Sequence, residues 1–314
     1  MTVSRVLNGH QNIREATRKR VMEAIDEMNY TRNSIARALA TKRSMRIGVI
    51  VDNPGYFGPS STLRAVEAAA RERGYAVSTF SVPDGEEGRI DSGVAELGTE
   101  GVDGLCVIAP RISSLDVLRR KSLGVPTLVI MEEEDDTIHT ASVDQRAGAV
   151  AAVQHLIDLG HRSILHIAGP LEWFDAKARA EAWRSTLQQA GLPVPEMLIG
   201  DWSSDSGYEL ARSLDLGDAT AVFAANDQMA LGLIHGLAEQ GLRGPEHVSV
   251  VGFDDLPDAR HFMPPLTTVR QKFTTLGRLV IAELLDAVEG RAVEHRELIQ
   301  PKLKVRASTA APRH

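Results

Sequence analysis

The first eight residues contain side-chain groups that can read the edges of DNA bases, on Thr2, Ser4, Arg5 and Asn8. On a short helix these side chains lie near one face, where hydroxyl, guanidinium and amide groups reach base edges and phosphates. In an intact helix-turn-helix an earlier helix crosses the phosphate backbone and holds the reading helix in the groove. No such segment precedes Met1 here. We therefore expect the second half of a helix-turn-helix whose first half is missing.

A second set of polar side chains follows apolar, strand-like runs later in the chain. Asn226 comes after AVFAA, Asp254 comes after VSVVGF, and Trp202 follows a strand that ends at Ile199. SILHIA leads through a short loop to Arg179. In parallel α/β sheets, ligands bind beyond the carboxyl ends of the strands. Carboxylate, amide and guanidinium groups bind sugar hydroxyls and an indole packs on a pyranose face, so the pattern predicts a carbohydrate cleft.

Each of these residues also has a structural interpretation. Asn226 and Asp254 stand before helical patterns, where short polar side chains commonly cap the helix. Trp202 taken alone is more often a packing residue than a ligand platform. The occurrence of four compatible residues at successive strand ends favours a binding site.

The elements that position these residues alternate along the chain from Met45 onward. Strand-like runs separated by amphipathic helix patterns indicate parallel sheets covered by helices on both faces. Two successive series predict two lobes. The first series has strands at 46–51, 75–80, 104–109 and 127–131 and a helix at 63–73. The second series has strands at 163–168, 221–225 and 248–253 and helices at 147–159, 177–190 and 228–240.

The first 46 residues form a basic head on an acidic body. They contain ten Lys or Arg and four acidic residues, a net charge of +6, which leaves −13 for the rest of a chain whose total is −7. DNA attracts a basic surface and repels an acidic one, so any contact with nucleic acid belongs to the head. Taken alone, such charges more often merely solvate helix faces.

Two further helices are predicted in the head. Residues 14–28 have apolar side chains at helical spacing, which predicts a helix packed on the recognition helix. Asn33 is a good N-cap for a short helix over 33–44. That helix could form when it pairs with its twin from a second subunit, with Leu39 wedged into a minor-groove base step. The alternative is a linker whose leucine packs on the body.

These motifs resemble the lactose/galactose repressor family of bacterial transcription regulators. The resemblance begins with TVSRVLNG at 2–9, NSIARALATKRS at 33–44 and RIGVIV at 46–51. It continues with GPLEWFDAKARAEAW at 169–183, GDWS at 200–203, ANDQMALG at 225–232, VVGFDD at 250–255 and PPLTTVRQ at 264–271, which look closer to the lactose-repressor branch than to the purine branch. Two departures are the missing start of the helix-turn-helix and Arg14 in place of a capping Ser.

The resemblance implies an α/β fold: a two-lobed, periplasmic-binding-protein-like body of two parallel, doubly wound sheets behind a small all-α DNA-binding head. The expected domains are the truncated helix-turn-helix at 1–32, the hinge helix or linker at 33–45 and the effector-binding domain at 46–310. Within the last, the N-lobe would cover about 46–145 and 272–300 and the C-lobe about 146–271 and 301–309.

The resemblance and the residue types together define two candidate sites. The residues expected to contact DNA are Thr2, Ser4, Arg5, Asn8, Tyr30, Asn33, Ala36, Leu39 and Lys42. In the family's effector site, Arg179, Asn226 and Asp254 would hold sugar hydroxyls, and Trp202 would stack on the ring. Gln271 and Phe273 would line the crossover between the lobes, with Asp52, Tyr56 and Pro59 closing from the N-lobe.

Other clusters are not expected to form sites. The acidic run Glu132 to Asp136 is interpreted as a solvated loop rather than a metal site. His161, His166 and the lone Cys106 are expected to be structural. No common catalytic or nucleotide-binding motif is present, so neither an enzyme nor a cofactor is expected. The sequence has no apolar run long enough to span a membrane and no signal peptide, and it is expected to be cytoplasmic.

The predicted function is a sugar-responsive, DNA-binding repressor of carbohydrate-utilisation genes. A homodimer would pair its hinge helices on a double-stranded, pseudo-palindromic operator, and a small sugar or glycoside between the lobes would change that pairing. The tail after Pro301 has no leucine heptad, so dimers are expected rather than tetramers. The alternative is a cytoplasmic sugar-binding module that has lost specific DNA binding.

Overall fold

The structure is a computed structural model that describes residues 3, 6, 13–28, 43–83, 89–108, 111–120, 124–133, 135–293 and 298–313. The chain forms two compact units, Met1–Ser44 and Met45–His314. The residues predicted to contact DNA all lie outside the described residues: Thr2, Ser4, Arg5, Asn8, Tyr30, Asn33, Ala36, Leu39 and Lys42.

The described part of the first unit is built on helix α2, Glu15–Glu27, where the apolar spacing predicted a helix. Arg14 occupies the N-cap position, and its side chain makes no capping hydrogen bond. A guanidinium has no acceptor atom to offer the first backbone N–H groups, so this end of the helix lacks the usual stabilisation. The apolar face borders a groove lined mainly by Val3, Val21, Ala24, Ile25 and Met28.

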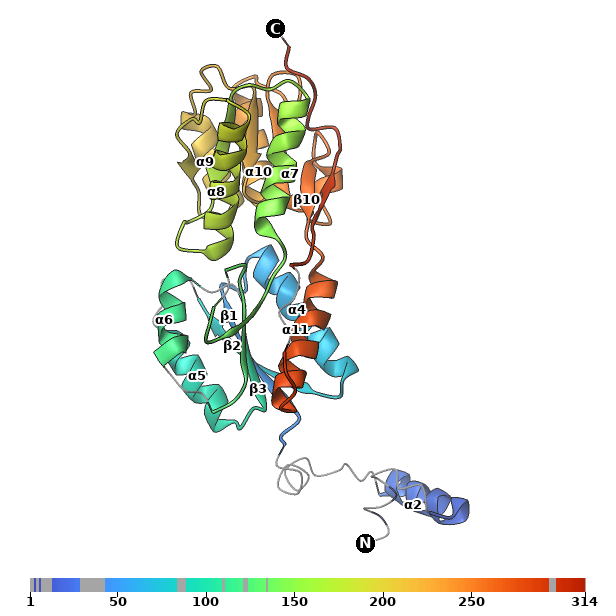
Figure 1. Ribbon diagram of the computed structural model, residues 1–314. Helices are drawn as coiled ribbons and strands as arrows, with labels where there is room; N and C mark the ends of the chain where they lie inside the picture. The colour runs from blue at the N-terminus through green and yellow to red at the C-terminus, as the bar shows by residue number, and fades with distance from the viewer. Residues whose placement is uncertain are drawn as a thin grey trace. The chain divides into compact units, whose positions relative to one another are not determined.

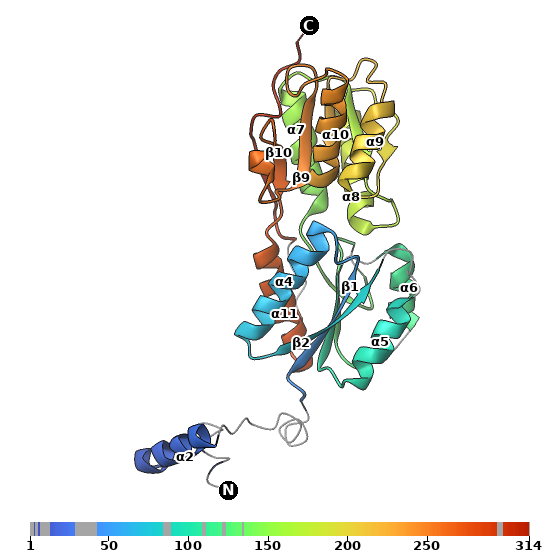
Figure 2. The same cartoon turned by 180° about the vertical axis from the view of Figure 1, so that it is seen from behind.

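The second unit begins with a parallel sheet in the order β2-β1-β3-β4-β5. Its central strands β1 and β3 are buried almost throughout, as expected for a parallel sheet between helices. Helices α4 and α11 cover one face, and α5 and α6 cover the other (Figures 1 and 2). The elements of this first lobe are β1 Arg46–Asp52, α4 Phe57–Glu72, β2 Ala76–Val82, α5 Ile90–Thr99, β3 Gly104–Ile108, α6 Ile112–Arg120, β4 Thr127–Ile130, β5 His139–Ala141 and α11 Phe273–Val288.

The second lobe contains a sheet in the order β11-β10-β9-β8-β6-β7, in which β11 runs antiparallel to β10 and the other neighbours pair in parallel. Helices α7 and α8 pack on one face and α9 and α10 on the other. The elements are α7 Gln145–Asp158, β6 Ile164–Ala168, α8 Phe174–Gln189, β7 Leu198–Ile199, α9 Ser204–Ser213, β8 Ala221–Ala224, α10 Asp227–Glu239, β9 Ser249–Asp254, the short η2 Ala259–His261, β10 Thr267–Arg270 and β11 Lys302–Lys304.

The chain crosses between the lobes three times: from β5 to α7, from β10 to α11 and from α11 to β11. The first two crossings are joined by a hydrogen bond from Gln145 Nε2 to Gln271 Oε1, 3.0 Å long. A β-bridge between Val143 and Ile299 joins the first to the third. These crossings lie on the side of α4, α11 and β10, whereas α6 and the lower end of α8 approach each other on the other side (Figure 1).

Two helices begin earlier than the sequence pattern predicted. Helix α4 begins at Phe57 rather than at residue 63, and α8 begins at Phe174 rather than at residue 177. The first turn of α4 contains Pro59, which a helix tolerates there because the first N–H groups have no partner inside the helix. Apolar periodicity does not show these first turns, because Phe174 packs into the core of the other lobe and Gly58 and Pro59 line the cavity.

The prediction of a solvated loop over residues 132–136 is wrong for two of its acids. Glu132 accepts hydrogen bonds from the backbone N–H groups of Gln145 and Arg146 at 2.6 and 3.1 Å. Burial raises the pKa of Glu132 to about 7, although those N–H groups lower it. Burial also raises the pKa of Asp135, but hydrogen bonds from Thr137 and Arg119 outweigh it and leave a value of about 2. These carboxylates join the loop to neighbouring elements.

The two histidines and the cysteine have structural roles, as predicted. His161 bonds to the hydroxyl of Thr220 and the carbonyl of Ala310, and His166 stacks on Phe223 with ring centroids 4.7 Å apart. Burial lowers the pKa of His166 to about 4, so its ring is neutral at physiological pH. Cys106 is buried in β3, and burial raises the pKa of its thiol to about 12, which makes it unreactive.

Candidate functional site

A cavity lies between the two lobes, where strand ends from both sheets meet the crossovers. Every residue predicted for the effector site except Asp52 lines it: Tyr56, Pro59, Arg179, Trp202, Asn226, Asp254, Gln271 and Phe273. Asp52 is buried beneath this surface and accepts a hydrogen bond from Arg111 Nε at 2.9 Å. The structure therefore gives Asp52 an ion-pair partner rather than a place on the cavity wall.

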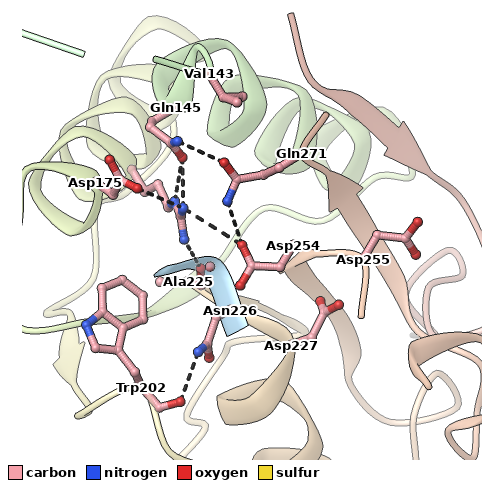
Figure 3. Close-up of polar contacts among 12 residues, drawn as sticks. Val143, Gln145, Asp175, Trp202, Ala225, Asn226, Asp227, Asp254, Asp255 and Gln271 are labelled. Carbon is pink, nitrogen blue, oxygen red and sulfur yellow. Dashed lines mark hydrogen bonds and ion pairs between the residues drawn. The ribbon is translucent and has the colours of Figure 1, made fainter. Parts of the chain in front are cut away.

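Arg179 is the centre of the polar wall. It projects from α8, is only 3% exposed, and donates from Nε and Nη2 to Gln145 Oε1 at 3.0 and 2.8 Å. Its Nη1 donates to the carbonyl of Ala225 at 2.6 Å, at the end of β8. Figure 3 shows two of these partners, Gln145 and Ala225, with dashed lines for the hydrogen bonds. Because three hydrogen bonds fix its direction, the group is preorganised for a ligand.

Asp254 closes a ring of side chains with Arg179. Gln271 Nε2 donates to Asp254 Oδ1 at 2.7 Å, and Arg179 Nη2 lies 4.0 Å from the same oxygen. Gln145 Nε2 in turn donates to Gln271 Oε1 at 3.0 Å, so the four residues form a closed cycle (Figure 3). Burial raises the pKa of Asp254 to about 6, although Arg179 and Gln271 favour its ionised form. The ring joins the sugar-binding candidates to both crossovers.

The backbone at Asp254 is as informative as its side chain. Its φ is +106°, a conformation that L-residues rarely adopt, and Asp255 follows at +57°. The hydrogen bond from Gln271 shows that Asp254 uses its carboxylate toward the crossover, so the helix-capping interpretation does not describe it. Strained backbone at a strand end is common in binding sites, where the surrounding structure fixes the position of one side chain.

Asn226 caps a helix and also lines the cavity. Its Oδ1 accepts a hydrogen bond from the N–H of Met229 at 2.9 Å, which caps α10. Its Nδ2 donates to the carbonyl of Trp202 at 2.9 Å, and the residue also lines the cavity. The cap therefore fixes the amide where a ligand hydroxyl can reach it, and the two interpretations are compatible.

The indole of Trp202 lines the cavity and occupies space that is free only because residue 169 is a glycine. Its own φ is +75°, and a Cβ added to Gly169 would lie 2.2 Å from the indole ring. The guanidinium carbon of Arg179 lies 5.7 Å from the ring centroid. Trp202 Nε1 is buried without a hydrogen-bond partner. The sequence GDWS therefore positions an indole beside the charged centre of the site, as a sugar platform requires.

The acids that follow Asn226 and Asp254 support the site from behind. Asp227 is fully buried and accepts hydrogen bonds from Thr268 Oγ1 at 2.5 Å and from the N–H of Leu256 at 2.8 Å. Asp255 pairs with Arg270 and with Arg306. These interactions hold the loop after β9 against β10 and the C-terminal segment, so the second residue of each polar pair is structural.

The first-lobe wall is almost entirely apolar. It includes Tyr56, with Phe57 and Phe273 in an edge-to-face pair whose ring centroids are 5.8 Å apart. Among the described residues of this wall, Thr62 donates its hydroxyl to the carbonyl of Gly58 at 2.9 Å rather than into the cavity. The remaining apolar contributors are Pro59, Ile108, Ile130 and Leu276.

Several lining residues were missed by reasoning from strand ends. Gln145 and Asp175 lie in the first turns of α7 and α8, and Trp173 is the N-cap of α8. Asp175 approaches Arg179 Nη2 at 3.6 Å, and burial raises the pKa of this carboxyl. The one sequence signal for Trp173 was an aromatic residue at a helix start, where Ser, Thr, Asp or Asn is usual.

The aliphatic hydroxyl groups that line the cavity bond to the protein backbone. The aliphatic hydroxyls that line the cavity belong to Thr62 and Ser142, and both donate to backbone carbonyls instead of facing a base. In the part of the chain that the structure describes, no three His, Cys, Asp or Glu side chains are grouped to hold a metal ion. None of the described helices is long and apolar enough to cross a bilayer.

Comparison with known proteins supports this geometry. Residues 1–33 match the family of bacterial regulatory proteins called the lacI family, and residues 153–309 match the periplasmic binding protein-like domain. The chain is 34% identical to the lactose operon repressor of Escherichia coli strain K12, over 99% of this chain and 87% of the relative. It is 34% identical to the HTH-type transcriptional repressor PurR of Pasteurella multocida, over 98% and 94%. A solved lac repressor dimer, bound to operator and the anti-inducer ONPF, superposes with a TM-score of 0.89 at 32% identity, over 99% of this chain and 95% of that one.

Proposed function

The chain belongs to the lacI family of bacterial regulatory proteins, and from that premise we propose that it is a DNA-binding transcriptional repressor controlled by a small neutral sugar or glycoside. The effector binds in the cavity between the lobes, and the basic head binds operator DNA. The observation that carries the proposal is the closed ring of Arg179, Gln145, Gln271 and Asp254. It lies at once on the cavity wall and at the crossovers between lobes.

The charges of the cavity favour a neutral ligand over an anionic one. Arg179, the cation that lines the cavity, has Asp175 at 3.6 Å and Asp254 at 4.0 Å. An added phosphate or carboxylate would meet these two acids without finding an uncommitted cation, and burying unpaired charge is costly. Hydroxyl groups, in contrast, can donate to the carboxylates and accept from the amides. A polyhydroxyl ligand therefore fits this wall better than a sugar phosphate or a purine nucleotide.

Control of DNA binding follows from linkage between the two sites. A sugar changes operator affinity only to the extent that it binds one arrangement of the lobes more tightly than the other. The ring of four side chains provides such a difference, because Gln145 and Gln271 stand on two crossovers that must move when the lobes rotate. A hydroxyl that replaces one bond of the ring therefore acts directly on the lobe arrangement.

The proposed assembly is a homodimer on a pseudo-palindromic, double-stranded operator in the cytoplasm, without enzymatic activity. Related repressors have been solved as dimers, including the lac repressor dimer bound to operator. Two-fold symmetry of the protein requires two similar half-sites in the DNA. The residues proposed to contact DNA remain those of the head, from Thr2 to Lys42, and their net positive charge supports that role.

The proposal is tested by two titrations on the same preparation. In a gel-shift assay, DNA flanking the gene of this protein is expected to bind the full chain more tightly than unrelated DNA of equal length. A thermal-shift screen of methyl β-D-galactoside, methyl β-D-glucoside, lactose and cellobiose is expected to raise the melting temperature with at least one sugar. That sugar should change the gel shift. If a sugar binds but no DNA is shifted, the protein is a sugar-binding module rather than a repressor. If the sugar is converted to a product, the protein is an enzyme.

A further inference from the structure

Residues 172–174, at the start of α8, attach the second lobe to the first on the side away from the crossovers (Figure 1). The backbone N–H of Ile112, in the first lobe, donates to the carbonyl of Glu172 at 2.9 Å. Phe174 is 5% exposed and belongs to an apolar cluster of the first lobe. Its neighbour Trp173 belongs to a cluster of the second lobe. Two consecutive aromatic residues therefore insert into the cores of different lobes.

Arg111 completes this contact from the first-lobe side. It forms an antiparallel bridge with Trp173, and its guanidinium carbon lies 5.2 Å from the centroid of the indole ring. The side chain is 6% exposed, so little water weakens the cation–π attraction. Its Nε donates to Asp52 Oδ2 at 2.9 Å, which fixes its direction. Arg111 is not among the residues that line the cavity.

Trp173, in contrast, lines the cavity as well as contacting Arg111. Its ring stands edge-on to Tyr56 of the first lobe at 6.3 Å and to Trp202 of the second lobe at 6.4 Å between centroids. The three aromatic rings form a corner that spans both lobes. As the N-cap of α8, Trp173 makes no capping hydrogen bond, so this position serves contact at the expense of helix capping.

We propose that Trp173, held in place by Arg111, is a specificity-determining residue that couples sugar binding to closure of the lobes. The inference rests on the proposed function. A sugar packed in the corner restrains the indole in the orientation that Arg111 contacts, so ligand binding and lobe contact strengthen each other. Arg111 acts as a positioning residue, through Trp173 and without touching the ligand, in a pair with Asp52.

The test uses Arg111→Lys with Arg119→Lys as its matched control. Arg119 also binds a buried aspartate of the first lobe, Asp135, but its ion-pair partners Asp116 and Asp135 both lie in that lobe. Calorimetry with whichever sugar of the screen binds the parent chain should give about tenfold weaker binding for Arg111→Lys, since lysine keeps the charge but loses the planar contact. The Arg119→Lys variant should bind within about twofold of the parent. Equal affinities for both variants would overturn the coupling.

A second measurement needs no sugar. Hydrogen exchange of the Ile112 amide, which bonds to Glu172, should accelerate in Arg111→Lys and stay as slow as in the parent in Arg119→Lys. If no sugar binds the parent, the proposed function fails, and this exchange rate still decides whether Arg111 holds the lobes together. If Arg111→Lys changes neither the exchange of the Ile112 amide nor the affinity for sugar, Arg111 does not couple the lobes. That result would leave the proposed sugar site intact.

The aromatic residue itself is tested by Trp173→Phe against Trp183→Phe. Trp183 is fully buried in the second lobe and does not line the cavity. A smaller ring at 173 is expected to weaken sugar binding about tenfold and to change the preference between monosaccharide and disaccharide, because the corner is enlarged. The Trp183 variant should lose thermal stability without changing that preference. An unchanged preference in Trp173→Phe would remove its role in specificity.

Discussion

The two walls of the cavity differ in chemistry according to the lobe that supplies them. The second lobe contributes the charged and amide groups around Arg179, Asn226 and Asp254, whereas the first lobe contributes rings and aliphatic side chains such as Phe57 and Leu276. The polar groups bond to one another. The apolar side chains need no such partners, so their wall is indifferent to the orientation of a hydroxyl.

This difference indicates a division of work between the lobes. Buried polar groups must find partners, and a site that hydrogen-bonds hydroxyls rejects analogues that lack them, so in the proposed function the second lobe recognises the sugar. An apolar wall contributes in proportion to the area it removes from water, so the first lobe supplies affinity when it closes. Recognition and closure are then separable by mutation.

The largest effect is expected from Arg179→Met on the polar wall. The change removes the buried group that donates hydrogen bonds to Gln145 Oε1 and to the carbonyl of Ala225. It also leaves Asp254 without its countercharge. Breaking a buried charge pair costs about 3–5 kcal/mol, which denaturant unfolding should show. Calorimetry should show no remaining sugar binding. The control is Arg212→Met, which removes an exposed arginine of the same lobe and should change neither quantity appreciably.

A smaller effect is expected when the indole is displaced without altering any polar group. In Gly169→Ala the new Cβ would collide with the ring of Trp202, and overpacking of this kind costs about 1–3 kcal/mol. Sugar affinity should fall roughly 30-fold, equivalent to about 2 kcal/mol, and tryptophan fluorescence should change. Gly98→Ala, where no atom lies within 4 Å of the added Cβ, provides the control. Retained affinity would show that Trp202 does not contact the sugar.

The apolar wall is tested by Phe273→Ala. Loss of the ring that pairs with Phe57 should weaken the binding of every sugar by about tenfold. The reason is that roughly 1.4 kcal/mol of binding free energy from apolar burial is lost. The ratio of affinities for two epimers should stay constant, since this wall makes no directional contact with hydroxyls. Asn226→Ala, in contrast, should change that ratio. If Phe273→Ala changes the epimer ratio as well, the division of work between the lobes is wrong.

A pH dependence is expected from Asp254, whose carboxylate faces Arg179, Asp175 and Asp227. Because its folded-state pKa is raised from 3.8 to about 6, its stabilising contribution is complete below pH 4 and is lost as pH rises through 6. The difference is at most about 3 kcal/mol. Sugar affinity should change in the opposite sense and weaken below pH 6, since a protonated carboxyl accepts hydroxyl donors poorly.

Denaturation and calorimetry at pH 4.5 to 7.5 on the parent and Asp254→Asn isolate this group. The stability difference between the two proteins should depend on pH in this range, and the asparagine variant should bind sugar with little pH dependence. Parallel curves for parent and variant would show that Asp254 does not titrate there.

The strand ends of the second lobe were predictable from the residues themselves. Asn226 and Asp254 follow apolar runs too short for helices, and parallel topology brings the carboxyl ends of such runs to one edge. Trp202 was predictable by the same reasoning, whereas Arg179 lies within α8. Asp52 also ends a strand, but its partner Arg111 lies 59 residues away and turns its carboxylate into an ion pair.

Gln145, Asp175 and Trp173 were not predictable in this way. Gln145 and Asp175 stand at helix starts, where polarity is usual for capping and therefore carries little information about ligands, and Trp173 precedes such a start. Their place in the cavity depends on the first turns of α7 and α8 facing the opposite lobe. The acidic loop was misjudged for a related reason, because only its approach to α7 gives Glu132 two backbone N–H partners.

The sequence by itself determined the two alternating series of strands and helices, the basic head, and the polar residues at the strand ends. These follow from local hydrophobic periodicity and from charge, which neighbouring residues define. Only the tertiary structure decided which polar groups satisfy one another and which aromatic rings join the lobes. The bond from Gln145 to Gln271 spans 126 residues, and no local pattern specifies the partner of a side chain at that distance.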